Sequence, residues 1–442
     1  MRPTVPFALA ALLALGSVER VARAQGTLTL GEAIGMAHAA SPDLRAAVAE
    51  IDRADAEHDK AISAYLPRLS ASVSGGGQIV RDTLPPIRAP FTLEPYDLRA
   101  GSADGRADLR WTLWDFGKTS GAAGAAARTR DARAHGASAA KAEVTRAAAT
   151  LFLTVIYDAQ LVDSKKISLR HRARHAALAK ALVDKGVRAP IDEARARLHL
   201  EAARQDVAAA EGRLLVDRAK LAEVLGVDPD ALGVPAKPVL PSMDEAPRAA
   251  AARAERSRPE IAAAAASVLA GEETLDAARA QYLPSLSLSG TGSYRLTRYD
   301  VEPNAVPRAE VSGQLTITVP IFDAHTPAAV AEARASLAAT EAKETLLRRR
   351  AKTEAAVAAL ELRTARALDA RARDLATSTQ AALGVVEARY QSGLASPLEL
   401  VDAETSDLDA RDALFAAEYR RQVATVDLAI ATGRAALLGG RP

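Results

Sequence analysis

The stretch YQSGLASPLELVDAE, residues 390–404, carries the signals of a tight corner between two helices. Gly393 supplies the left-handed conformation that ends a helix, and Leu394 is placed to fold back on the last turn. Ser396 and the proline after it restart the helix, because a serine oxygen accepts a free amide hydrogen bond and proline has no amide to satisfy. Glu399 completes a capping box with the serine. The stretch therefore predicts a helical hairpin.

A weaker copy of this corner, VDKGVRAPIDEARAR, begins 207 positions earlier, at residue 183. The copy keeps Gly186 as the helix-ending residue and Pro190 as the helix-starting residue, and it has an acid at Asp192. Ala189 stands where a serine would cap, so the side-chain cap is lost. The sequence thus predicts two helical corners at equivalent places.

The two corners belong to a repeat that covers nearly the whole chain. SPDL at 41 corresponds to RPEI at 258, YLPRLS at 65 to YLPSLS at 282, and LWDFGKT at 113 to IFDAHTP at 321. We predict a first repeat at 25–235, a proline-rich linker at 236–247 and a second repeat at 248–442. Each repeat is expected to hold a helix, a β-hairpin at about 66–115 or 283–322, and a long helical hairpin with its tip near 186–190 or 393–397.

Residue periodicity separates the strands from the helices. After Tyr65 the pattern changes from helical to alternating, with Leu69 and Val73 on one face and Ser70 and Ser72 on the other. Four such strands of about 10 to 13 residues are predicted, with a proline-bearing loop at 80–100 in the first hairpin. The helices expected at 118–185 and 327–392 are each roughly 100 Å long, and they return along 191–225 and 398–432.

The alternating strands have the length and pattern of transmembrane β-strands. The same pattern fits a four-stranded soluble sheet with one wet face. Four strands cannot close a barrel around a channel, and open strand edges do not persist in lipid. The residues alone therefore leave a soluble sheet or a barrel that several chains share.

The N-terminus has the organisation of a secretory signal peptide. Arg2, an apolar core and Ala-Arg-Ala at 22–24 predict cleavage after residue 24. This removal takes three of the 57 basic and one of the 55 acidic residues, which leaves 54 of each. A chain without a basic excess is not expected to bind nucleic acid. Because the chain has no cysteine, disulfides and lipid attachment through an N-terminal cysteine are excluded.

The signal peptide, the strands, the long helical hairpins and the duplication together resemble the TolC-like outer-membrane efflux protein family. The motifs that carry the resemblance are SPDL at 41, the two YLP-x-L-S stretches, LWDFGK at 113, PIFD at 320 and the paired corners. The resemblance implies a mainly helical homotrimer. Each protomer would give four transmembrane β-strands to a shared outer-membrane β-barrel and its coiled-coil hairpins to a periplasmic α-barrel.

The resemblance also implies a function. The family supplies the exit duct of a tripartite efflux pump or of type I secretion, as a passive channel without catalysis or cofactor. Its partners would be a periplasmic adaptor (membrane fusion) protein, an inner-membrane transporter and outer-membrane lipid. The implied adaptor-docking residues are Gly186, Val187, Gly393 and Leu394. The implied pore-constriction residues are Asp402, Glu399 and Tyr390.

The chain departs from the family pattern at Ala395. Family members often carry an arginine there, which faces an acid at the position of Asp192. In this chain an arginine follows the first glycine instead, at Arg188. We therefore expect a latch of reversed polarity, in which Arg188 pairs with Glu399. The alternative is that Glu399 only caps its own helix and Arg188 is unpaired.

Two other functional classes compete with a channel. An enzyme would need converging catalytic groups, and the sequence offers none. His171 and His175 have a spacing suited to zinc, but neighbouring arginines and the lack of a third ligand favour a solvated helix face. Gly121 and Gly124 are expected to allow close helix packing. The stronger rival is a secreted periplasmic coiled-coil structural protein, which explains the alanine-rich helices but not the strands.

Overall fold

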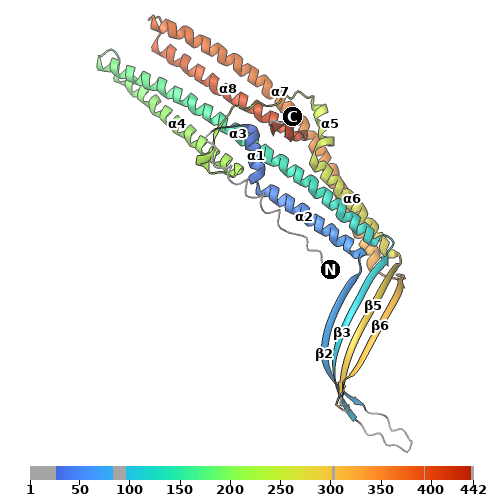
Figure 1. Cartoon of the computed structure of the whole chain (residues 1–442). Coiled ribbons are helices and arrows are strands. Elements are labelled where there is room, and N and C mark those ends of the chain that lie inside the picture. Colours follow the sequence, from blue (N-terminus) through green and yellow to red (C-terminus); the bar gives the residue numbers. More distant parts are fainter. Residues whose placement is uncertain (1–25, 83–95, 301–303, 393, 440–442) are drawn as a thin grey trace, which may run out of the picture. The chain divides into compact units, whose positions relative to one another are not determined.

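The computed structural model describes residues 26–82, 96–300, 304–392 and 394–439 (Figure 1). The expected signal peptide at 1–24 lies outside these residues. The first half contains β1 (Thr27–Leu28), α1 (Leu30–Ala40), α2 (Pro42–Ile62), β2 (Arg68–Asp82), β3 (Tyr96–Trp114), α3 (Lys118–Asp184), α4 (Pro190–Leu225) and β4 (Val234–Pro235). The second half contains α5 (Pro247–Ser257), α6 (Pro259–Arg279), β5 (Ser285–Tyr299), β6 (Val306–Thr318), α7 (His325–Gln391) and α8 (Pro397–Ala431).

The order of elements confirms two repeated halves. Each half has two short helices, two long strands, a 67-residue helix and a returning helix, and the first half also has the two-residue strands β1 and β4. Ser41 separates α1 from α2, and its hydroxyl accepts a hydrogen bond from the N–H of Leu44 (3.3 Å). Within the predicted linker, residues 236–246 carry no helix or strand. The predicted linker included Pro247, but this residue is the first of α5. Proline is favoured at a first helical position.

The described chain forms two compact units. The first comprises residues 26–49, 135–262, 345–392 and 394–439, and the second comprises residues 50–82, 96–134, 263–300 and 304–344. Both repeats contribute to both units. The duplication therefore does not correspond to two separately folded domains.

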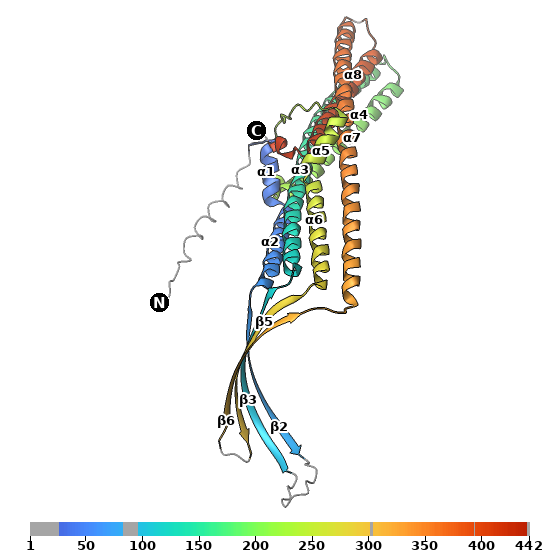
Figure 2. The same cartoon turned by 90° about the vertical axis from the view of Figure 1, so that its right-hand side faces the viewer.

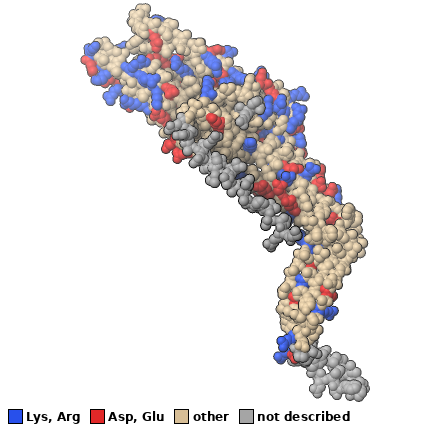
Figure 3. All heavy atoms as spheres, viewed as in Figure 1, with Lys and Arg blue, Asp and Glu red and all other residues tan. Residues whose placement is uncertain are grey.

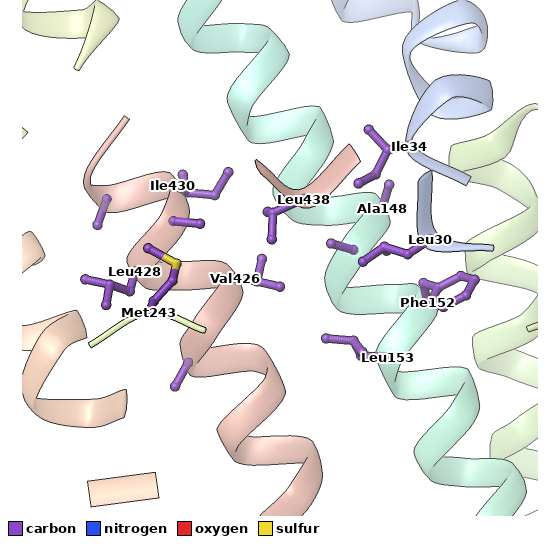
Figure 4. Packing of buried hydrophobic residues seen from close by; sticks show 14 of the residues in the cluster. Leu30, Ile34, Ala148, Phe152, Leu153, Met243, Val426, Leu428, Ile430 and Leu438 are labelled. Atoms are coloured by element: carbon purple, nitrogen blue, oxygen red, sulfur yellow. The ribbon is translucent and has the colours of Figure 1, made fainter. Parts of the chain in front are cut away.

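An apolar cluster holds the helices of the first unit together. Leu30 and Ile34 of α1 meet Phe152 and Leu153 of α3, and residues of α8 including Val426 close the cluster (Figure 4). Phe152 and Leu153 have no exposed surface, so truncating either would leave a cavity and cost roughly 3 to 5 kcal/mol. Alanines at the contact positions let the helix backbones approach closely.

Glycines bring α3 and α6 together in the second unit. A Cβ at Gly121 would lie 2.9 Å from the Cβ of Ala277, and a Cβ at Gly124 would lie 2.8 Å from a carboxylate oxygen of Glu273. At Gly121 the neighbours include backbone atoms, so a side chain does not fit there, whereas at Gly124 the flexible Glu273 side chain would have to move. The expected role of the two glycines in close helix packing is thus confirmed. Among the described residues, no helix combines the length and apolar character needed to cross a membrane.

The second unit also contains a four-stranded antiparallel sheet in the order β2-β3-β5-β6 (Figure 2). Both predicted hairpins are present, and β3 pairs with β5 to join them. The strands are 15, 19, 15 and 13 residues long, so the prediction of 10 to 13 residues was too short for three of them. Pairing of β2 with β3 extends to Asp82 and Tyr96, inside the predicted loop. The ladder continues there because backbone hydrogen bonding does not depend on side-chain alternation.

The two faces of this sheet differ as the alternating pattern predicts. Apolar side chains on one face are strongly exposed to solvent: Leu69, Val73, Val311 and Leu315. The opposite face carries serines, threonines and charged residues, including an ion pair between Asp104 and Arg295. In the view of Figure 3, charged side chains are dense over the helices and sparse over the sheet. An apolar face of this extent requires an environment other than water.

Candidate functional site

The first predicted corner forms between α3 and α4. Gly186 has φ 71°, the left-handed conformation that favours glycine. The N–H of Val187 donates to the carbonyl oxygen of Leu182 (2.9 Å), and the N–H of Gly186 donates to that of Val183 (2.9 Å). These two bonds define a Schellman cap. As predicted, Ala189 provides no side-chain cap to α4.

The second corner joins α7 to α8 through the predicted capping box. The N–H of Glu399 donates to the hydroxyl of Ser396, and the N–H of Ser396 donates to the Glu399 carboxylate, each at 3.2 Å. The N–H of Leu394 donates to the carbonyl oxygen of Arg389 (2.7 Å), the bond that a Schellman cap needs. Gly393 itself lies outside the described residues.

Exposed apolar residues occupy equivalent places in the two corners. Val187 is 65% exposed and Leu394 is 72% exposed, and Ile191 and Leu398 are also exposed. The expectation that Leu394 folds back on its helix is therefore wrong. Its side chain projects into solvent, because the cap is secured by backbone bonds without it.

The structure brings the two corners together around one groove of ≈ 420 Å³. Leu178 and Leu182 line it from α3, and Leu398 and Val401 line it from α8. Arg188 and its neighbour Asp192 contribute the charged part of the wall. A surface that is mostly apolar with a charged edge is suited to binding another protein.

The expected latch residues have other partners within this chain. The guanidinium of Arg188 lies 3.8 Å from the Asp192 carboxylate, one turn along α4. Hydrogen bonds from Ser396 occupy the Glu399 carboxylate and lower its pKa. Among the described residues of a single chain, Arg188 and Glu399 are therefore not paired. Pairing with a residue one turn away restricts fewer side-chain and backbone conformations than pairing with a residue on another hairpin, so it loses less conformational entropy.

The expected pore-constriction residues lie around the start of α8. Asp402 follows Glu399 by one turn, and both are exposed. Tyr390 is half-buried near the end of α7. A charged ring requires acidic side chains that are exposed, and Asp402 is exposed beside the corner. The ring itself depends on neighbouring copies and stays a prediction.

The sequence favours a solvated helix face for the two histidines, and this prediction is wrong. His171 Nδ1 lies 3.0 Å from one oxygen of Glu404, and His175 Nε2 lies 2.7 Å from the other. Glu404 is buried on α8, and Arg172 donates to the hydroxyl of Thr405 beside it (2.8 Å). The spacing of the histidines was visible in the sequence, but their partner is more than 200 positions away. No cluster suited to a metal occurs in the described part of the chain.

A buried pair of acids between α3 and α4 was not predicted from the sequence. Asp158 is 2% exposed and faces Asp217, and one Asp158 oxygen has no hydrogen-bond partner. Burial, together with the hydrogen bond to Asp217 and its charge, raises the pKa of Asp158 to about 6. Lys220, 2.7 Å from Asp217, lowers the pKa of that second carboxyl. Below about pH 6, Asp158 therefore holds the proton and Asp217 holds the charge.

Comparison with known proteins identifies the family. The family described as "Outer membrane efflux protein" matches residues 33–227 and 250–434. Protein CyaE of Bordetella pertussis is 31% identical over 428 residues, which cover 94% of this chain and 86% of CyaE.

Solved structures share the fold. A crystal structure of a membrane protein from Pseudomonas aeruginosa has a TM-score of 0.77 and 25% identity, covering 91% of this chain and 93% of that chain. The outer membrane protein VceC from Vibrio cholerae has a TM-score of 0.77 and 20% identity, covering 91% of this chain and 96% of VceC. The chain therefore belongs to the outer membrane efflux protein family, whose members are non-catalytic channels of the outer membrane.

Proposed function

We propose that the chain is one protomer of a homotrimeric exit duct. The observation that carries this proposal is the four-stranded sheet, which has one exposed apolar face and one polar face. Its outer strands, β2 and β6, each have one edge without a partner in the described residues. A lipid environment does not tolerate such edges, so copies of the chain would complete a barrel. Membership of the family removes the rival of a periplasmic structural protein.

Electrophoresis and fractionation test this duct. The full-length protein should be recovered from the outer membrane in detergent and should migrate as a trimer that heating converts to a monomer. Native mass spectrometry should give three copies. A protein that salt alone extracts from the periplasm as a monomer would refute the proposal.

The duct would operate with a periplasmic adaptor and an inner-membrane transporter. The two corners support this part of the proposal, since each presents an exposed apolar residue beside a shared groove. In a trimer the corners would give six similar contact points. The duct performs no chemistry and requires no cofactor, because the transporter would supply the energy.

Asp402 is proposed to lie in a ring of three carboxylates close to the pore axis. Such a ring attracts cations and repels anions. Replacing Asp402 with alanine should therefore weaken cation selectivity and relieve block by divalent cations in planar-bilayer recordings. Asp409→Ala is the matched control, because Asp409 is also exposed on α8. Equal selectivity and block in wild type and Asp402→Ala would leave Asp402 as a solvated charge.

The Arg188–Glu399 latch remains a proposal only between neighbouring copies. Exposed pairs contribute about 0 to 1 kcal/mol each, so three bridges would bias an aperture without locking it. Cysteines at the two positions should form an inter-chain disulfide under oxidising conditions. Failure to cross-link in the closed channel would leave Arg188 with Asp192 and Glu399 with its cap.

A further inference from the structure

Two arginines face each other directly on the polar face of the sheet. Strand pairing sets Arg68 of β2 opposite Arg110 of β3, and both positions share the face that carries Ser70 and Thr112. Like charges placed opposite each other in neighbouring strands repel. Within the described residues, neither guanidinium has a carboxylate within 4.0 Å. This part of the face carries an uncompensated positive charge.

Two other arginines on the same face have a carboxylate beside them. Asp104 pairs with Arg295, and Glu310 lies 4.0 Å from Arg308. The row of Arg68 and Arg110 continues with Ser289 and Gln314, which are uncharged. This row therefore sets two arginines in register with no acid.

The acid nearest along the strand is already engaged. Asp108, two positions before Arg110, accepts a hydrogen bond from the hydroxyl of Thr291 (3.0 Å). Thr291 belongs to β5, which lies on the opposite side of β3 from β2. Asp108 keeps its negative charge in this bond, but among the described residues it lies more than 4.0 Å from both guanidiniums, so the two arginines have donors available for another anion.

The two arginines line a hollow of ≈ 590 Å³ together with side-chain hydroxyls. The hydroxyls come from three strands: Ser70, Thr112, Ser287 and Ser289. A guanidinium presents a planar fork of donors that matches a carboxylate or a phosphate, and a hydroxyl supplies a further donor. All of these groups can donate to an anion, and the hollow contains no acidic side chain.

We propose that Arg68 and Arg110 form a binding site for the carboxylate or phosphate groups of solutes that pass through the channel. This inference rests on the proposed duct, in which the polar face lines the interior. Three copies then place six arginines at one level of the pore. This level of the pore would attract solutes with anionic groups. Its positive charge is opposite in sign to that of the acidic ring proposed at Asp402.

Inorganic phosphate is the probe for this site. The full-length protein in planar bilayers is compared with the Arg68→Gln, Arg110→Gln double variant. Phosphate should reduce the ionic current of the wild type, and the variant should need an about tenfold or higher phosphate concentration, since two charge-assisted contacts are lost. The variant should also shift the reversal potential toward cations. Arg308→Gln is the control, because this arginine shares the face but has Glu310 beside it.

Phosphate block and the stability of the trimer decide the proposal. Equal phosphate block in wild type and double variant overturns the proposal. If the trimer of the double variant also loosens, the arginines would be assigned to acids of a neighbouring copy. If the glutamine variant does not fold, Arg68→Lys with Arg110→Lys decides: it should keep the reversal potential and weaken the block. A wild type that is monomeric and does not insert into membranes refutes the duct, and phosphate titration calorimetry on the same sample then decides the site.

Discussion

Replacing Leu394 with tryptophan should abolish efflux without disturbing the folded trimer. The side chain of Leu394 is 72% exposed, so a larger residue meets no core and should leave stability within about 0.5 kcal/mol. It does alter the surface that the second corner would offer to an adaptor. Val187→Trp changes the equivalent position of the first corner and should have the same effect. The measurements are drug susceptibility of cells and the fraction of heat-modifiable trimer in their membranes.

Leu215→Trp is the matched control for the corner variants. Leu215 is 67% exposed on α4 and lies 25 positions after Pro190, away from the corner. Efflux should survive this change. Loss of the trimer in Leu394→Trp would show that the corner holds the fold, and normal efflux with an intact trimer would remove the corners from the docking surface.

The second large effect is a fall in stability as the pH rises through about 6. The pKa of Asp158 is raised from 3.8 to about 6 in the folded chain. Between these values the folded state binds more protons than the unfolded state, so the free energy of unfolding decreases with rising pH. Each pKa unit corresponds to about 1.4 kcal/mol, which makes the loss roughly 2 to 3 kcal/mol above pH 6.

Asp158→Asn should remove this dependence. Asparagine keeps the size of the side chain and can donate to Asp217 as the protonated acid does. Arg213 and Lys220 face the pair from α4, and both oppose the rise in the pKa of Asp158, so they stay unchanged in the experiment. Thermal unfolding of the full-length protein in detergent, from pH 4.5 to 7.5, should show the variant gaining stability over the wild type as the pH rises.

Asp163→Asn controls for the loss of one charge on α3, because Asp163 is exposed. Its melting temperature should follow that of the wild type across the pH range. Parallel curves for Asp158→Asn and the wild type would mean that the buried pair does not share a proton.

Local chemistry made much of the fold predictable. The caps at Gly186 and Ser396 are built from neighbours within six positions, so sequence alone places them. Alternation in the strands reports which side chain shares a face with which, and both faces were predicted correctly. The ends of β2 and β3 were predicted incorrectly, because the pairing of the two strands continues where the side-chain pattern stops.

The candidate sites divide in the same way. The two corners and the exposed acid Asp402 beside the second corner involve residues that are close in sequence. Pairing of Arg68 with Arg110 depends on strand register, and the contacts of Glu404 and Asp158 depend on which helices pack together. Periodicity gives the face of an element but not the element that it meets. The sequence therefore determined the elements, their corners and their order, and only the tertiary structure decided which distant charges share a site.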